Sequence, residues 1–523
     1  PLTVHVAAEV GGLQGREKRI LTVRHTQGYD CVVVKNDRGV SVPEEGWLRI
    51  ATDSGTFAQI GRQRAARGEM TAQRVLLNQL INPHDRVRLT NKWDNKGGLL
   101  QGEGRAAVVQ MLKHEALFAL QGPPGTGKTE VTAQAVADWV EEEETTRVLV
   151  SAQSHDALEN LAARVVDKLG LTTKPSKDAN LNRIALRVTS KGQREMAPRV
   201  REFTAENLVE GVIGHSTRQA QRWLKASGGK APELCAVVSD WIAALPSSRL
   251  ELSRRAQAAA NIVFATTGVA TRARLTNGAT DEPFDWVLVE EAGRAWPTEL
   301  ALPLVRGVRW TLVGDHAQIG AYSRADVEKL LIELQHSQDE RLKAMYDARE
   351  RYSEYFSTFG RLFDADREGA PRLTLTEQYR MHQDIADMVG SIFYSNSGGL
   401  VTRRAEHPHP LEEPAAFLDS RLVWVDTGEA ERSIGYWSND HEADLCARII
   451  RDLRPCPQPP TSASRPTIAV TTPYRDQRAK IASRLGDLES SVFTIDGFQG
   501  READIVIASL VRDRVVSGSS EIS

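Results

Sequence analysis

Residues 116–130, ALFALQGPPGTGKTE, join a short apolar strand to a glycine-rich loop and the start of a helix. The loop matches GxxxxGK[ST], in which glycines let backbone N–H groups close around phosphates and the next helix adds its positive end. Because the pattern lies between a strand and a helix, it predicts a nucleotide site. The residues predicted to bind the phosphates are Gly122, Pro123, Gly125, Thr126, Gly127, Lys128 and Thr129. Lys128 is expected to neutralise the β- and γ-phosphates, and Thr129 to bind Mg²⁺.

The composition excludes several classes of protein. The chain has 523 residues, which corresponds to roughly three or four domains of ~150 residues each. No run approaches the ~18 apolar residues of a membrane helix, so we expect no contact with a membrane. Only four cysteines occur and none forms a CxxC pair, which argues against zinc, iron–sulfur and disulfide frameworks and predicts a reducing, cytoplasmic location.

Short apolar segments alternate with helical ones after the phosphate loop. We expect strands at 116–120, 147–150, 261–266, 286–289 and 310–313. This alternation is typical of a parallel sheet with helices on both faces, an α/β fold. A second series, at 422–426, 467–472, 492–495 and 504–511, predicts a second copy of the same architecture.

About 110 residues separate the second strand from the third, far more than a crossover needs, which predicts a helical insertion. Within 161–223, twelve Lys and Arg face six Asp and Glu, although the whole chain has a net charge of −3. Two interpretations stay open for this basic stretch: a solvated helical surface or a contact with nucleic acid.

The predicted organisation has five parts. A β-rich accessory domain at 1–55 is expected from runs such as ILTV and CVVV, and a helical stalk follows at 56–94. The first α/β lobe comprises 95–164 and 259–368, interrupted by the helical insertion at 165–258. The second lobe comprises 369–523.

Four further segments narrow the class of nucleotide-binding protein. They are LVEEAG (288–293), TLVGDHAQIGAY (311–322), LTLTEQYRMHQDIADMV (373–389) and FTIDGFQGREADIVIASLVR (493–512). Their order resembles superfamily 1 helicases, in the branch of the nonsense-mediated-decay helicase, over roughly residues 95–512. The resemblance implies two RecA-like lobes that bind ATP between them, with Mg²⁺ as cofactor and 5′-to-3′ movement on single-stranded DNA or RNA.

The resemblance also implies roles for individual residues. Glu291 would be the catalytic base beside the attacking water, and Gln318 would sense the γ-phosphate or that water. Arg380 would reach the γ-phosphate from the second lobe, and Lys128 would contact it from the first. Tyr379 would stack on the adenine, and Glu502 would contact the ribose or the interface between lobes.

Segments 151–160, 266–272 and 471–474 match those that contact a single strand in the family, through backbone and hydroxyl groups that bind phosphate. The corresponding candidate residues for nucleic-acid binding are Ser154, Thr266 and Thr472.

The sequence departs from the family pattern in three places. Glu290 replaces the usual Asp, which keeps a carboxylate for Mg²⁺ but lengthens it by a methylene group. Gly104 stands where the family has a Gln that reads adenine, so we expect relaxed base specificity. The Arg-rich motif that follows DGFQGRE in the family is not part of this sequence; a protein that lacked it would bind ATP but hydrolyse it slowly.

Two functions of different classes follow. The first is an ATP-dependent helicase or translocase. The second is an ATP-gated module that binds nucleic acid or a protein partner, with weak hydrolysis and no unwinding. Glu290, Gly104 and the Arg-rich motif missing from this sequence favour the second. The first is favoured by intact Lys128, Glu291, Gln318 and Arg380, because a site used only for binding needs neither a base nor a water-positioning Gln.

Overall fold

The computed structural model divides into two compact units, residues 1–74 and 75–523. The structure describes residues 3–7, 20–27, 31–35, 47–50, 54–82, 88–143, 145–172, 183–189, 196–227, 231–271, 275, 282–321, 324–354, 356–364, 371–403, 420–427, 437–453, 467–486, 491–498 and 501–511.

The first unit contains an antiparallel sheet with strand order β3-β2-β1-β4. Its strands are β1 (Thr3–Ala7), β2 (Ile20–Gln27), β3 (Cys31–Lys35) and β4 (Trp47–Ile50). The runs ILTV and CVVV lie in β2 and β3, since β-branched residues suit a pleated surface. Helix α1 (Ser54–Ala72) follows the sheet.

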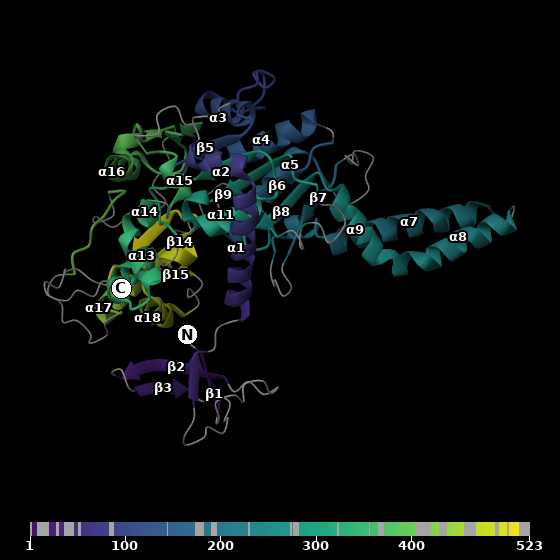
Figure 1. Ribbon diagram of the computed structural model, residues 1–523. Coiled ribbons are helices and arrows are strands. Elements are labelled where there is room, and N and C mark those ends of the chain that lie inside the picture. The colour runs from purple at the N-terminus through teal and green to yellow at the C-terminus, as the bar shows by residue number, and fades with distance from the viewer. Residues whose placement is uncertain are drawn as a thin grey trace. The chain divides into compact units, whose positions relative to one another are not determined.

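The second unit is organised around a seven-stranded sheet with order β11-β5-β10-β9-β6-β8-β7, in which every neighbouring pair is parallel (Figure 1). The strands are β5 (Leu117–Gln121), β6 (Val148–Ala152), β7 (Ala185–Arg187), β8 (Ile262–Thr266), β9 (Trp286–Glu290), β10 (Trp310–Gly314) and β11 (Arg372–Thr374). All five strands expected in the first lobe are present. Because they run parallel, their carboxyl ends lie at one edge of the sheet, where ligands bind in such folds.

Two strands of this sheet correct the sequence-based organisation. β7 lies inside the range predicted as a helical insertion, 165–258, yet it pairs with β8. β11 lies inside the range predicted for the second lobe, 369–523, yet it pairs with β5. Both strands have only three residues, too short for an apolar pattern to reveal them, and their place depends on a free sheet edge.

Helices cover the large sheet and bury a common core. They include α3 (Gly102–Lys113), α4 (Lys128–Glu142), α5 (His155–Lys168), α6 (Pro198–Arg201), η3 (Ala292–Arg294) and α11 (Pro297–Leu304). Helix α2 (Arg74–Ile81) precedes them in the chain. Trp286 and Trp310 are fully buried, and their indole N–H groups donate to Thr311 Oγ1 at 2.9 Å and to Leu304 O at 2.8 Å. These tryptophans therefore serve packing rather than base stacking.

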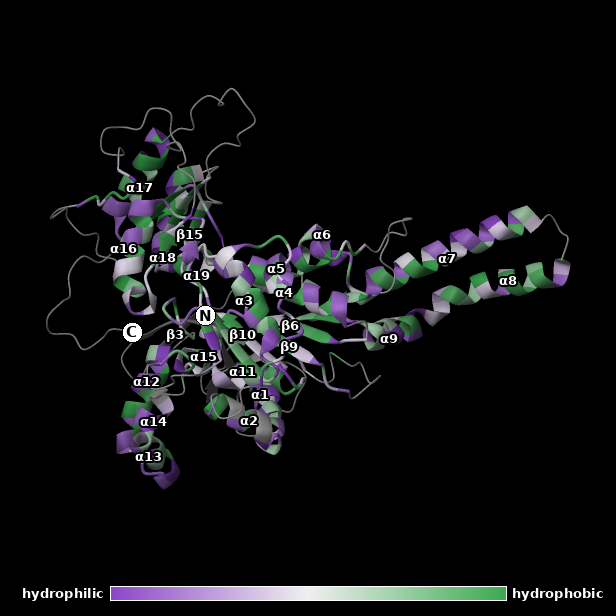
Figure 2. Ribbon diagram, turned by 90° about the horizontal axis from the view of Figure 1, so that it is seen from above, coloured by the Kyte–Doolittle hydropathy of each residue, from purple (hydrophilic) through white to green (hydrophobic). Residues whose placement is uncertain are grey.

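The insertion carries a helical hairpin. Helices α7 (Ala205–Ser227) and α8 (Pro232–Ala244) lie side by side and project from the sheet, followed by η2 (Leu245–Ser248) and α9 (Arg249–Ala259) (Figures 1 and 2). Its core is small and consists of Val209, Ile213 and Leu245, with Leu252 packed against them. In Figure 2 hydrophilic residues occur along the length of α7, whereas α8 is mostly hydrophobic, and its Leu234, Val237 and Trp241 are 50%, 62% and 48% exposed.

Short helices connect β10 to β11 of the large sheet: α12 (Arg324–Glu333), η4 (Leu334–His336), α13 (Glu340–Asp347), α14 (Arg349–Glu354) and α15 (Thr358–Arg361). After β11, β12 (Glu377–Gln378) and β13 (Val401–Thr402) form a small two-stranded sheet. In the sequence, α16 (Gln383–Phe393) and η6 (Ser395–Ser397) lie between these two strands. In the helices that the structure describes, no segment is long and apolar enough to cross a membrane.

The last part is a three-stranded parallel sheet with order β15-β14-β16. Its strands are β14 (Ile468–Thr472), β15 (Val492–Thr494) and β16 (Ile505–Ala508), and its helices are α17 (Asp440–Asp452), α18 (Arg475–Leu485) and α19 (Ile495–Phe498). The strand expected at 422–426 is wrong: these residues form no strand, and Trp424 is 79% exposed. An apolar, β-branched run becomes a strand only where a neighbour accepts its hydrogen bonds.

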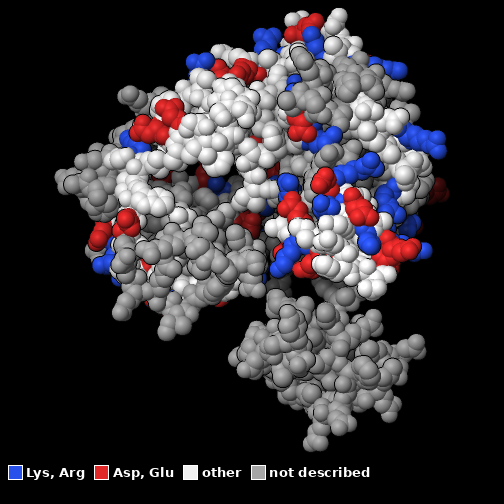
Figure 3. Space-filling view, turned by 60° about the vertical axis from the view of Figure 1, so that its left-hand side comes forward, with Lys and Arg blue, Asp and Glu red and all other residues white. Residues whose placement is uncertain are grey.

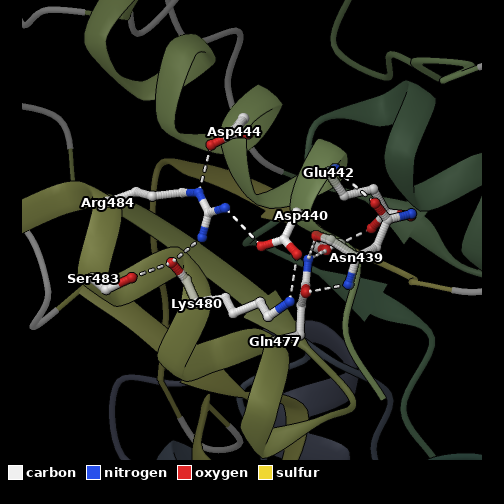
Figure 4. A network of polar contacts seen from close by, with 9 residues as sticks. Asn439, Asp440, Glu442, Asp444, Gln477, Lys480, Ser483 and Arg484 are labelled. Carbon is white, nitrogen blue, oxygen red and sulfur yellow. Dashed lines mark hydrogen bonds and ion pairs between the residues drawn. The ribbon is translucent and has the colours of Figure 1, made fainter. Parts of the chain in front are cut away.

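A polar network joins α17 to α18 (Figure 4). Arg484 forms ion pairs with Asp440 and Asp444, and Lys480 pairs with Asp440 at 2.6 Å. Next to them, Gln477 accepts the Asn439 N–H at 2.8 Å and donates to Ser509 Oγ at 3.0 Å. Gln477 thereby links the starts of both helices to the end of β16.

Candidate nucleotide-binding site

The predicted phosphate loop connects β5 to α4 at the carboxyl edge of the large sheet. Gly125 and Gly127 have φ angles of +79° and +77°, a conformation that favours glycine, and Gly127 is the N-cap of α4. Thr126 Oγ1 donates to Pro123 O at 2.8 Å and thus closes the turn. The loop therefore has the shape and the free helix N-terminus that a phosphate group needs.

Lys128 begins α4, and its ammonium group donates to Gly122 O and, at 3.3 Å, to Pro123 O. A Cβ on Gly122 would collide with the Lys128 side chain, so glycine is required for this close approach. Burial lowers the pKa of Lys128, and the carboxylates of Asp315, Glu290 and Glu291 oppose this shift. The lysine thus lies next to the acidic residues of two neighbouring strands.

Glu290 is the last residue of β9 and is 4% exposed, and Glu291 follows with φ +57° and ψ +31°. Such a left-handed conformation costs a non-glycine residue about 1–3 kcal/mol and is typical of functional sites. One carboxylate oxygen of each residue, Glu290 Oε1 and Glu291 Oε2, is buried without a hydrogen-bond partner among the described residues. Burial raises the pKa of Glu290 to about 7, and repulsion from Glu291 adds to the shift, whereas the Thr129 hydroxyl and Lys128 oppose it.

These carboxylates fit a divalent cation. Buried oxygen atoms that lack partners, next to the Thr129 hydroxyl, are the ligands that Mg²⁺ prefers. The lengthened side chain of Glu290 still lies beside Thr129, so the residues predicted to hold the metal are close together. Metal binding by Thr129 and Glu290 stays a prediction.

The pKa of Glu290 has a consequence for stability. In metal- and nucleotide-free protein, the folded chain keeps a proton on Glu290 from its ordinary pKa of 4.5 up to about 7, whereas the unfolded chain releases it. The folded state then binds more protons, so the free energy of unfolding falls as the pH rises through this window, on the order of 1–3 kcal/mol.

We therefore expect the Glu290→Gln variant, which cannot titrate, to gain stability relative to wild type between pH 4.5 and pH 7. Urea-unfolding midpoints measured in EDTA at about pH 5 and pH 8 check this. A difference between variant and wild type that is the same at both pH values would contradict it.

Asp315 follows β10 and organises the loop that carries Gln318. Its Oδ2 accepts the Gln318 amide at 2.8 Å and the Tyr394 hydroxyl at 2.6 Å. Its Oδ1 accepts Ala317 N–H at 3.1 Å and the Gln121 amide at 3.3 Å. Gln318 is thus held near the phosphate loop by a buried carboxylate.

The QYR segment lies against the phosphate loop. Tyr379 N–H donates to Gly125 O at 2.9 Å, and a Cβ on Gly125 would come within 2.5 Å of Arg380 Cβ. Gln378 shapes the turn, because its Oε1 accepts the N–H groups of Arg380 at 2.9 Å and Met381 at 2.7 Å. Tyr379 is 53% exposed, and its hydroxyl donates to Glu377 at 3.1 Å.

Arg380 and Glu502 form an ion pair, although 122 residues separate them. The pair joins the QYR segment to the residues just before β16. Arg501 also lies 3.7 Å from Asp156 at the start of α5. The structure therefore brings together the residues predicted to act at the interface between lobes, and their roles toward ATP stay predictions.

The three residues predicted to bind nucleic acid lie at the start of one helix and at the ends of two strands. Ser154 is the N-cap of α5 and accepts Ala157 N–H at 3.2 Å. Thr266, at the end of β8, is 7% exposed, and Thr472, at the end of β14, is fully buried. Because both threonine side chains are buried here, contact with a strand would require them to become accessible; the contact itself stays a prediction.

Sequence reasoning missed four residues of this region: Glu103, Asp315, Gln378 and Tyr394. Glu103 accepts Thr376 N–H at 2.8 Å, Thr376 Oγ1–H and Glu377 N–H at 2.9 Å, and so anchors the start of the QYR segment to α3. Gly104, next to it, lies within α3, with space for a Cβ in ordinary contact with Val131 at 3.7 Å. Asp315 and Gln378 lie inside quoted motifs, which was a signal; Glu103 and Tyr394 carry none.

Together these features define a P-loop nucleotide-binding protein whose phosphate loop lies at the edge of a parallel sheet. Comparison with protein families agrees: one AAA domain model matches residues 100–234 and 216–322, and a second AAA domain model matches residues 355–522. The ATP-dependent helicase NAM7 of Saccharomyces cerevisiae is 27% identical over 455 residues, which cover 84% of this chain and 41% of the yeast protein.

Regulator of nonsense transcripts 1 of Caenorhabditis elegans is 27% identical over 438 residues, covering 80% of this chain and 35% of that protein. The chain belongs to the superfamily 1 helicases, in the nonsense-mediated-decay branch. It spans less than half the length of these two relatives. The crystal structure of the arterivirus nonstructural protein 10 helicase matches with 15% identity and a TM-score of 0.32, over 77% of this chain and 55% of that chain, too low to place any residue.

Proposed function

We propose that this chain is an ATP-dependent helicase or translocase that moves 5′ to 3′ on single-stranded nucleic acid. One observation carries the proposal: Lys128, Glu291 and Arg380 converge on the phosphate loop from three separate segments, close enough for the charges of Glu291 and Arg380 to shift the pKa of Lys128. A site that only binds nucleotide needs neither a buried base nor an arginine from a distant segment.

The residues divide the chemistry between them. Lys128 and the N-terminus of α4 bind the β- and γ-phosphates, and Tyr379 stacks on the base. Thr129 and Glu290 would hold Mg²⁺, which when bound neutralises charge on the phosphates. Glu291 accepts the proton of the attacking water, and Arg380 stabilises the negative charge that spreads over the γ-phosphate.

Binding of ATP would couple to movement through the Arg380–Glu502 pair. A γ-phosphate is a stronger partner for Arg380 than one exposed carboxylate, because it presents more charge to the guanidinium group. Arg380 would then exchange Glu502 for phosphate on binding and return after hydrolysis. Each exchange would change the contact between the QYR segment and the residues before β16. It would thereby change how tightly the protein binds the nucleic-acid strand.

The distribution of charged side chains on the surface fits a nucleic-acid strand that is bound at a few local contacts. On the face shown in Figure 3, Lys and Arg alternate with Asp and Glu over the described surface. No broad basic face is visible there, so we propose that strand binding depends on the ends of β6, β8 and β14 rather than on overall charge. The cysteine pattern supports a cytoplasmic location for this activity.

Steady-state ATP hydrolysis by the full chain in Mg²⁺, with and without single-stranded DNA or RNA, tests the proposal together with strand displacement. We expect one strand type to stimulate hydrolysis at least about 10-fold and duplexes with a 5′ overhang to be unwound in preference to 3′ overhangs. Strand binding without stimulated hydrolysis or displacement would support the ATP-gated binding module instead.

A further inference from the structure

Tyr394 connects a separate segment of the chain to the nucleotide site. It lies immediately after α16, is 2% exposed, and its hydroxyl donates to Asp315 Oδ2 at 2.6 Å. The same oxygen accepts the Gln318 amide at 2.8 Å. Asp315 Oδ2 therefore accepts hydrogen bonds from Gln318, which is predicted to sense the γ-phosphate, and from the buried phenol of Tyr394, 79 residues away.

The backbone holds Tyr394 firmly. Its N–H donates to Gly390 O at 3.1 Å, and its carbonyl accepts the N–H groups of Ser397 and Gly399, each at 2.9 Å. Gly390 itself lies so close to Leu400 that a Cβ would approach Leu400 N to 3.2 Å. With the main chain fixed on both sides, the phenol has little freedom to leave Asp315.

In this contact the Tyr394 phenol is always the donor and the Asp315 carboxylate the acceptor. Burial raises the pKa of the Tyr394 phenol far above its ordinary value, and the Asp315 carboxylate raises it further, so the phenol stays a neutral donor. Asp315 Oδ1 already accepts Ala317 N–H and the Gln121 amide, which leaves Oδ2 to Tyr394 and Gln318. With the Tyr394 bond in place, both carboxylate oxygens have partners, and the Gln318 side chain is hydrogen-bonded to Asp315 and to the Tyr394 hydroxyl.

We propose that Tyr394 is a positioning residue for ATP hydrolysis: through Asp315 it fixes the Gln318 side chain, and it thereby makes this chemistry depend on where α16 lies. The inference rests on the proposed function. Since α16 directly follows the QYR segment, the segment that supplies Arg380 also controls Gln318. Two groups that contact the γ-phosphate would then be placed by one structural element.

The test uses the full chain and the variants Tyr394→Phe, Gln318→Ala and the double variant, with Tyr352→Phe as a control. Tyr352 lies on α14, is 44% exposed, and loses the same hydroxyl group away from the site. For each protein, kcat and KM for ATP are measured with the stimulating strand. The affinities for ADP and for a non-hydrolysable β,γ-imido ATP analogue are measured by displacement of a fluorescent nucleotide, and thermal melting checks the fold.

We expect Tyr394→Phe to lower kcat about 10-fold and to change KM less than about 2-fold, because a bond to a charged acceptor is lost while nucleotide binding stays. In the Gln318→Ala background the same substitution should change kcat less than about 2-fold, since it acts through the missing residue. The preference for the imido analogue over ADP should fall about 3-fold or more in Tyr394→Phe and not in Tyr352→Phe.

A 10-fold loss of kcat that persists in the Gln318→Ala background would overturn the proposal, because Tyr394 would then act by supporting the fold. An unchanged kcat and an unchanged preference between the imido analogue and ADP would overturn it as well. Failure of the proposed function has a separate signature, the absence of strand-stimulated turnover in wild type. The preference between the two nucleotides needs no turnover and still decides the role of Tyr394 in that case.

Discussion

The Glu291→Gln variant is expected to bind ATP as wild type does and to hydrolyse it about 100- to 10,000-fold more slowly, the range a general base contributes. Glu291 leaves β9 in a left-handed conformation, and its Oε2 is buried without a described partner, so it is free to accept a proton. An amide has the same shape but cannot accept that proton. Nucleotide affinity should be little changed, because the phosphates are bound by Lys128 and the loop before it.

Steady-state turnover and fluorescent-nucleotide binding measure the two quantities separately. The matched control is Glu328→Gln, which makes the same substitution on α12 at an exposed carboxylate paired with Arg324 at 3.0 Å. Exposed pairs of this kind contribute little, so the control should behave as wild type. Turnover within a factor of about 3 of wild type in Glu291→Gln would remove Glu291 from the role of base.

The Arg380→Ala variant is expected to lose at least about 1000-fold in kcat, the lower end of what an arginine supplies to phosphoryl transfer. Arg380 lies over the phosphate loop, where Gly125 has no Cβ to displace it. Its guanidinium group is delocalised and permanently charged, so Arg380→Lys should recover only a small part of the loss. The effect should fall on kcat more than on ATP affinity, because spread negative charge develops in the transition state.

Arg324→Ala on α12 removes an arginine from an exposed ion pair and serves as the control. The same turnover and binding measurements apply, again with the strand that stimulates wild type. If Arg380→Ala weakened ATP binding by the factor by which it lowered turnover, Arg380 would be a ground-state ligand. If Arg380→Ala changed neither ATP binding nor turnover, Arg380 would have no role toward ATP and would serve only in its ion pair with Glu502.

Local sequence was enough to predict the nucleotide site and the class of fold. The phosphate loop forms its turn from glycines and short-range bonds such as Thr126 Oγ1 to Pro123 O, all within a few residues. The buried strands of the large sheet are continuous apolar runs, which a parallel sheet covered by helices requires. Such features are encoded over five to eight neighbouring residues, and a single sequence displays them.

Only the tertiary structure decided how distant segments meet at the site. The bonds from Glu103 to Thr376 and from Tyr394 to Asp315 join residues 273 and 79 positions apart, and neither Glu103 nor Tyr394 belongs to a recognisable motif. The run at 422–426 has the composition of a strand but forms none, whereas β11, with three residues, becomes one beside β5. In each case a buried polar group or an open strand edge must find its hydrogen-bond partner elsewhere in the chain, and local pattern does not say where that partner lies.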